Sequence, residues 1–261
     1  MFLTIEQQID LIKSKNIIID KKTSLFLKKI NYYHFMSYKN FFYQNGELHK
    51  YKTNITTNDF YTLYCYDTQI KKVLFEVYNQ IYSKMINSLV NIIYNTVGFK
   101  DSEYLTSTIF KDKNKCIKLF ETMIQCNHML KAYKKEHGFI PIWIFLNSIT
   151  INDFVDVLIN LNNNIKEKLF NVLKISLLDN DFLYYLKNLY TNILTNNKTL
   201  DFKFNKHSIM NFIDFCEMLK INIAKIKKVY NDILISISSI SYEDLNRETG
   251  YEDKYYDKKQ N

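Results

Sequence analysis

The stretch of sequence that decides the fold runs from residue 58 to residue 96 and reads NDFYTLYCYDTQIKKVLFEVYNQIYSKMINSLVNIIYNT. Its apolar side chains recur at helical spacing and keep to one stripe, which is typical of an amphipathic helix. The stripe consists of Phe60, Leu63, Tyr64, Ile70, Leu74, Val77, Tyr78, Ile81, Met85, Leu89, Ile92 and Ile93. Neither Gly nor Pro interrupts it before Gly98. We therefore predict one long helix from Asn58 to about Thr96.

Periodic segments on both sides predict further helices of the same kind. They cover residues 4–15, 20–30, 114–136, 150–160, 164–173, 179–195 and 206–235. Thr4 and Gln7 have the spacing of a capping box, and Asp20 suits the N-cap of the second helix. Gly138 is typical of a helix end, and Pro141 is typical of the first turn of a further short helix.

The composition favours an all-α fold. The chain has 4 Gly and 1 Pro in 261 residues, which is too few for the many tight turns of sandwiches and α/β folds. We predict a single all-α domain over residues 1–240, an elongated bundle built on the helices at 58–96 and 206–235. Residues 241–261 are charged and lack helical periodicity, so we predict a mobile tail there.

The cysteines and the apolar runs bound the setting of the chain. The four cysteines are scattered, without the spacing of a metal site or a disulfide framework. We therefore expect no metal, no disulfide and no cofactor, and a reduced cytoplasmic setting. No run of 18 apolar residues occurs, so we expect no transmembrane helix. The first residues lack the basic cluster and apolar run of a signal peptide.

The net charge of +8 indicates that the chain could contact a nucleic acid. Arg247 is the only arginine among the 35 basic residues. Because arginine is the side chain that binds phosphate in a bidentate manner, its rarity weakens any case for specific readout. The charge is compatible with RNA as a partner but does not establish it.

An aromatic stretch, INYYHFMSYKNFF, occupies residues 30–42. Tyr32, Tyr33 and Tyr38 have large apolar rings with a polar end, and such side chains pack well at a helix junction. We expect these three tyrosines to tie the N-terminal helices to the bundle. The alternative is a basic, aromatic-lined groove for single-stranded RNA, in which two or three of the lysine doublets at 28–29, 71–72, 134–135 and 227–228 converge near Tyr32, Tyr33 and Lys187. The candidate RNA-binding residues are Tyr32, Tyr33, His34, Tyr38 and Lys71.

Four segments in this order resemble the Abi-like proteins of bacterial abortive phage infection, of the AbiD and AbiF type. They read TIEQQIDLIKSKNIIID from Thr4, FLKKINYYHFMSY, LYCYDTQIKKVLFEVYNQI and IPIWIFLNSITINDFVDVLINL, and they span about residues 4–161. The tyrosine pair with a later tyrosine looks like the hallmark of the family. Asp67 and Lys71 match its aromatic-Asp helix, and Pro141 and Trp143 match its Pro-x-Trp segment.

The resemblance implies an all-helical antiviral protein of the cytoplasm, related to HEPN ribonucleases and interacting with RNA. HEPN enzymes cleave RNA without a metal, and two protomers commonly pair, so we consider RNA and a second copy of the chain as candidate partners. In those enzymes an Arg stabilises the phosphorane charge while a His four to six residues away transfers the proton.

The sequence departs from that catalytic pattern. The piece that aligns with the family's Arg-Asn-x3-His motif begins at Lys187 and Asn188 and places Asn192 where the His belongs. Asn cannot exchange a proton near neutral pH, and no His follows the single Arg247. We therefore expect catalysis to be lost or non-standard, and His34, at the hallmark's basic position, is the residue to test. The alternatives are a non-catalytic helical sensor or regulatory subunit with a protein partner, and a decayed defence gene.

Overall fold

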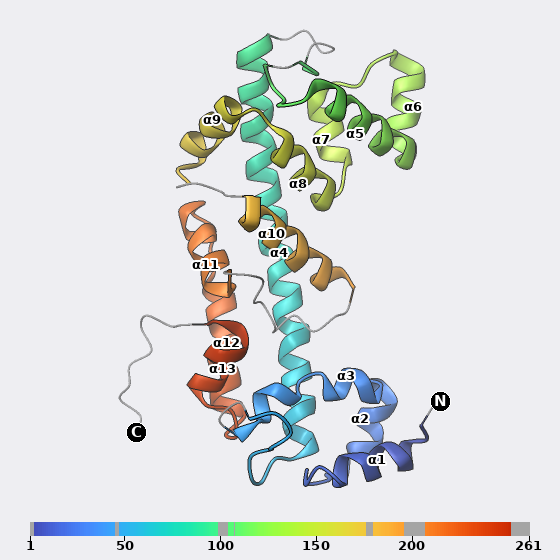
Figure 1. The fold of residues 1–261 in the computed structure, drawn as a ribbon, viewed down its shortest axis with the longest axis vertical. Helices are drawn as coiled ribbons and strands as arrows, with labels where there is room; N and C mark the ends of the chain where they lie inside the picture. Colours follow the sequence, from blue (N-terminus) through green and yellow to red (C-terminus); the bar gives the residue numbers. More distant parts are fainter. Residues whose placement is uncertain are drawn as a thin grey trace. The chain divides into compact units, whose positions relative to one another are not determined.

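The computed structural model describes residues 3–44, 47–98, 104–106, 108–175, 180–195 and 207–251 (Figure 1). Their elements are α1 (Ile5–Lys13), α2 (Thr23–Lys29), α3 (Tyr32–Met36), the 3-10 helix η1 (Lys39–Phe42), α4 (Thr57–Val97), α5 (Lys113–Cys126), α6 (His128–His137), α7 (Ile142–Ser148), α8 (Ile151–Asn160), α9 (Asn163–Leu173), α10 (Asn180–Leu194), α11 (Ile209–Met218), α12 (Ala224–Ser236) and α13 (Tyr242–Thr249). These described residues contain isolated β-bridges but no strand. The predicted all-α fold class is therefore confirmed.

The chain divides into two compact units. Unit 1 comprises Met1–Phe75, Asn192–Ile213 and Ile223–Asn261, and unit 2 comprises Glu76–Thr191 and Asp214–Asn222. Helices α4, α10 and α11 contribute residues to both units. Each unit has its own buried apolar core. The single domain that the sequence predicts over residues 1–240 stays a prediction.

Helix α4 confirms the long helix predicted from the apolar stripe. Its start is fixed in unit 1 by Asp20, whose Oδ2 accepts hydrogen bonds from the Asn58 backbone N–H (2.7 Å) and the Thr57 hydroxyl (2.9 Å). A parallel bridge between Ile18 and Thr56 brings these segments together. The prediction that Asp20 caps the second helix is therefore wrong: Lys22 is the N-cap of α2, and Asp20 instead accepts hydrogen bonds from the first turn of α4.

Two of the predicted long helices are broken. Asn127 divides residues 114–136 into α5 and α6, because its side chain accepts hydrogen bonds from the Met129 and Leu130 N–H groups and starts a new helix. Residues 206–235 divide into α11 and α12, where Lys220 adopts a left-handed conformation with a φ of 54°. There the Ile221 N–H bonds to the Cys216 carbonyl and ends the first helix.

The C-terminal segment of unit 1 also differs from the prediction. Ser241 and Asp244 form a capping box that starts α13, and Leu245 and Tyr251 are buried. The prediction of a mobile tail over residues 241–261 is therefore wrong for residues 241–251. Residues 252–261 lie outside the described ranges. Other predicted boundaries are confirmed: the capping box of Thr4 starts α1, and Gly138, with a φ of 80°, ends α6.

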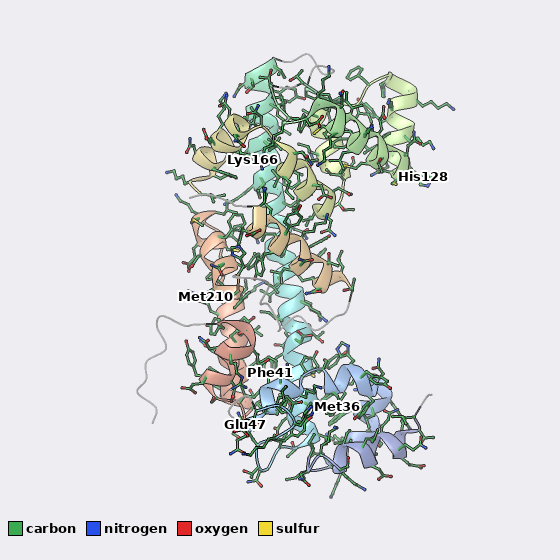
Figure 2. The ribbon with its side chains drawn as sticks, in the orientation of Figure 1. Met36, Phe41, Glu47, His128, Lys166 and Met210 are labelled. Atoms are coloured by element: carbon green, nitrogen blue, oxygen red, sulfur yellow. The ribbon has the colours of Figure 1, made fainter. Side chains whose placement is uncertain are left out.

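The core of unit 1 is rich in aromatic rings where α3 and η1 meet α4. Phe35 and Phe42 pack against Phe60, with ring centroids 5.0 and 4.4 Å apart. Met36 of α3 and Phe41 of η1 are buried in the same region (Figure 2). This packing holds the aromatic stretch against the first half of α4 and sets the position of the site described next.

Candidate nucleic-acid interface

The centre of the candidate site is Asp67, a fully buried carboxylate on α4 in unit 1. The Tyr38 hydroxyl donates a hydrogen bond to its Oδ2 at 2.9 Å. The Lys71 ammonium, one helical turn further along α4, lies 3.4 Å from the same oxygen. A carboxylate so deeply buried is tolerated only where charge and hydrogen bonds compensate its lost hydration. Tyr38 and Lys71 provide that compensation.

His34 of α3 extends this network toward the surface. Its Nε2 lies 3.3 Å from the Tyr38 hydroxyl oxygen. Because the Tyr38 hydroxyl donates its proton to Asp67, the oxygen is an acceptor for an N–H at Nε2, which leaves the lone pair on Nδ1. Burial lowers the pKa of His34 and nearby Lys71 lowers it further, while Asp67 acts in the opposite direction. His34 is therefore a neutral imidazole at pH 7, fixed in one tautomer.

A row of half-exposed rings continues from His34 along α4. The edge of His34 meets Tyr64 with ring centroids 5.6 Å apart, and Tyr64 stacks with Tyr61 at 6.0 Å. Phe26 of α2 lies flat against Tyr61 at 4.0 Å and supports it from below. We call Lys29, His34, Tyr61, Tyr64 and Lys71 the basic aromatic surface.

Two lysines accompany these rings. The exposed Lys29 has its ammonium 3.4 Å from the Tyr61 hydroxyl and 5.7 Å from the centre of the ring. Lys71 lies near His34 but is 12% exposed and already paired with Asp67. Half-exposed rings with lysine nearby are the elements from which single-stranded nucleic-acid sites are built, since bases stack on rings and lysine attracts phosphate.

The other residues of the predicted hallmark take different positions. Tyr38 is fully buried and orients His34 from beneath, and burial together with Asp67 raises its pKa so that the phenol stays protonated. Tyr32 is half-buried, but Tyr33 is 74% exposed and touches Tyr32 only edge-on. The prediction that Tyr33 packs the N-terminal helices onto the bundle is therefore wrong. Trp143 is 49% exposed, whereas Pro141 is buried at the N-cap of α7.

The degenerate motif lies on α10. Lys187 belongs to unit 2, where its ammonium lies 2.9 and 2.8 Å from the two carboxylate oxygens of Asp156 on α8. Asn188 is exposed beside it, and Asn192 belongs to unit 1. The structure thus brings together His34, Tyr38, Asp67 and Lys71, while Lys187 is neutralised by a carboxylate that the sequence did not single out.

Sequence reasoning missed Tyr61 and Tyr64 as members of the surface, and it considered Lys29 only as part of a lysine doublet. Residues 61, 64, 68 and 71 follow the i, i+3, i+7, i+10 spacing of one helical face. That spacing was available as a signal on α4. The contribution of Lys29 was not, because it depends on how α2 packs against α4.

The described part of the chain holds neither a metal-binding cluster nor a membrane-spanning helix. Among these residues, no group of three or more His, Cys, Asp and Glu side chains is placed to hold a metal ion. Within the same ranges, no helix combines the length and apolar character needed to cross a membrane. All four cysteines are free thiols.

Fold and site together define an all-helical protein with a basic, aromatic surface around a buried Asp-Tyr-His network. The family model described as Abi-like protein matches residues 25–196, a range that contains the aromatic stretch, Asp67, Pro141, Trp143 and the α10 motif. This match covers more than half of the chain, so the chain belongs to the Abi-like family, and a role in abortive infection, a form of phage defence, is supported. No curated protein and no solved structure matches the chain.

Proposed function

We propose that this Abi-like protein acts in phage defence by binding single-stranded RNA through the basic aromatic surface of unit 1. The observation that carries the proposal is the row of half-exposed rings, His34, Tyr64 and Tyr61, with Lys29 bound at its far end. The bundle is proposed to be HEPN-related, and its setting cytoplasmic.

The chemistry of the surface favours unpaired over duplex RNA. Rings can stack only on bases that are not already stacked and paired within a helix. The site uses lysine rather than arginine, so its phosphate contacts are point charges without bidentate geometry. We therefore expect binding that tolerates many sequences and weakens steeply with salt.

Binding rather than cleavage is the expected outcome. Lys187 and Asn192 stand where the resemblance calls for Arg and His, and Asn cannot exchange a proton near pH 7. The neutral His34 is the one imidazole of the basic aromatic surface. Efficient metal-independent cleavage needs both a proton acceptor and a proton donor for the leaving oxygen, so we propose that catalysis is lost or non-standard.

The test is fluorescence anisotropy of a labelled short single-stranded RNA at several salt concentrations. Replacing Tyr61 and Tyr64 together by Ala is expected to weaken binding by about tenfold or more, since each stacked base is worth about 1–3 kcal/mol. Tyr184→Ala is the matched control, because Tyr184 is also a partly exposed tyrosine but lies in unit 2. Equal loss in both variants would refute the assignment of the surface.

Further outcomes separate the other interpretations. Absence of RNA binding at low salt, with a specific protein partner recovered instead, favours a non-catalytic sensor or regulatory subunit. Rapid cleavage of the RNA without metal, abolished by His34→Ala, contradicts the loss of catalysis. Normal folding without protection of cells against any phage tested indicates a decayed defence gene.

A further inference from the structure

Helix α6 of unit 2 has almost no packed face. Of its ten residues, only Leu130 is buried, and Tyr133 is the one residue of intermediate exposure. Within unit 2 the helix stands at the outer edge, where His128 marks its first turn (Figures 1 and 2). Most helices of this length depend on tertiary packing for stability. The open face of α6 is therefore a surface without a visible partner.

The helix is nevertheless held firmly at both ends. Asn127 caps its start, and the Asn127 side-chain amide donates a hydrogen bond to the Ser148 carbonyl at the end of α7 (2.6 Å). Gly138 ends it in a left-handed conformation, with its N–H bonded to the Lys134 carbonyl. Two residues beyond Gly138, Ile140 is buried and its carbonyl accepts a hydrogen bond from the Tyr104 hydroxyl (2.9 Å). Because both ends are anchored in this way, the exposed face is presented in a defined position.

A groove runs between α5 and α6 with a volume of about 570 Å³. From α5 it is lined by Lys118, Glu121, Thr122, Ile124, Gln125 and Cys126, and from α6 by Lys134. The α5 residues 118, 121, 122 and 125 follow the i, i+3, i+4, i+7 spacing of one helical face. They form a wall about 10 Å long, given the helical rise of about 1.5 Å per residue.

The two helices that flank the groove, α5 and α6, are strongly positive. Residues 113–137 contain six Lys and two Glu, a formal charge of +4 with both His neutral. All six lysines are exposed. On α6 itself, Met129 is 75% exposed, so the helix that carries Lys134 also presents an apolar side chain to solvent. An acidic partner with apolar residues at helical spacing complements both properties.

We propose that the α5–α6 groove is a docking site for an acidic amphipathic helix of a partner protein. Its carboxylates pair with Lys118 and Lys134, while its apolar stripe packs on the exposed Cys126 and on the aliphatic stems of the two lysines. Pairing of two copies groove to groove is disfavoured, because both grooves are flanked by the same positive charge. The apolar side chains favour a protein over RNA, and the site does not depend on RNA binding in unit 1.

The native cysteine in the groove gives a direct assay. Cys126 is exposed, and Cys116 and Cys216 are buried, so a Cys65→Ser background allows an environment-sensitive dye to be attached at Cys126. The dye-labelled protein is titrated with three synthetic helical peptides: one with a Glu face and a Leu face, a scrambled version, and one with Lys in place of Glu. A short single-stranded RNA is the fourth titrant.

The acidic peptide is expected to give a saturable signal, and the scrambled one none. Lys118→Glu combined with Lys134→Glu is expected to weaken the acidic peptide by about tenfold or more and to gain binding of the Lys peptide. Lys21→Glu with Lys22→Glu, an equal charge change on exposed residues of unit 1, is expected to leave binding unchanged. Circular dichroism checks that both variants fold.

Three outcomes overturn the proposal. Equal responses to the acidic and scrambled peptides show that the groove attracts acidic peptides only through non-specific charge. Loss of peptide binding in the Lys21→Glu, Lys22→Glu control as well shows that the binding depends on total charge and not on the groove. A saturable response to the RNA that the groove variant abolishes, without any response to the acidic peptide, assigns the groove to nucleic acid instead.

Discussion

Each unit contains an Asp–Lys pair, and the pair with the longer contact is the more deeply buried one. In unit 1 the Lys71 ammonium lies 3.4 Å from Asp67, and the two side chains are 12% and 0% exposed. In unit 2 the Lys187 ammonium lies 2.8 Å from Asp156, and these side chains are 31% and 33% exposed. The shorter pair is the more solvated one.

The environment, more than the distance, decides what such a pair contributes. Water solvates Lys187 and Asp156 whether or not they touch, so breaking their contact changes little. Asp67 is fully buried, so loss of Tyr38 or Lys71 removes a stabilising contact that water cannot replace. We therefore expect the Asp67–Lys71 pair to be required for the stability of unit 1. We expect the Lys187–Asp156 pair to be a replaceable surface contact.

The largest expected effect comes from removing the buried carboxylate. Asp67→Ala leaves the Lys71 ammonium without its carboxylate and the Tyr38 hydroxyl without its acceptor. We expect the free energy of unfolding to fall by about 3–5 kcal/mol. Urea denaturation at pH 7, followed by circular dichroism, measures the change.

A partial rescue makes this result specific. Replacing Lys71 by Met in the Asp67→Ala background removes the stranded charge, so the double variant is expected to be more stable than Asp67→Ala alone. Tyr38→Phe loses the hydrogen bonds of the Tyr38 hydroxyl to Asp67 and to His34 and is expected to cost about 1–3 kcal/mol. If Asp67→Ala lowers the free energy of unfolding by no more than replacement of an exposed aspartate does, the proposed contrast between the two pairs is wrong.

A third pair, Lys52–Asp244, also lies in unit 1 and is intermediate in burial. It makes the stability of the unit depend on pH. Its side chains are 22% and 5% exposed. Burial acts to raise the pKa of Asp244, but hydrogen bonds from Lys52 and Ser241 outweigh it and lower the pKa below its usual value. A carboxyl with a lowered folded pKa stabilises the fold above its unfolded pKa, about 3.9, and loses that contribution as the pH falls through the folded value.

We therefore expect the stability difference between wild type and Asp244→Asn to be full near pH 7 and to shrink as the pH falls below about 4. Urea denaturation of both proteins in steps from neutral to acidic pH gives this difference directly. Subtracting the variant removes the contribution of the other carboxyls. A difference that stays constant across the whole range would show that the Asp244 charge is not what stabilises α13.

Periodicity was sufficient to predict the helical fold but not its breaks. The apolar stripe of α4 and the spacing of Thr4 and Gln7 are local signals, and both were confirmed. Asn127 and Lys220 end helices without Gly or Pro, and a left-handed lysine costs about 1–2 kcal/mol, which no local pattern favours. The capping box that starts α13 was visible in the sequence at Ser241 and Asp244.

The site was less predictable, because its key contacts join distant residues. The spacing of Asp67 and Lys71 places them on one helical face, but the bond from Tyr38 to Asp67 spans 29 residues. The tautomer of His34 depends on that bond. Arg247, the only arginine, contacts the Asp244 carboxylate and the Asn40 carbonyl in unit 1. Its role in holding α13 follows from tertiary packing that the sequence does not display.

The smallest expected effect is at the degenerate motif. Lys187→Ala and Asp156→Ala are each expected to change the free energy of unfolding by no more than about 1 kcal/mol, and their double-mutant cycle to give a coupling of about 0.2–1 kcal/mol. Phage challenge of cells expressing Lys187→Ala then tests function apart from stability. Wild-type protection is the expected result, because the Lys187 ammonium is already neutralised by Asp156. Lost protection in a variant of unchanged stability would instead assign Lys187 a direct role in defence.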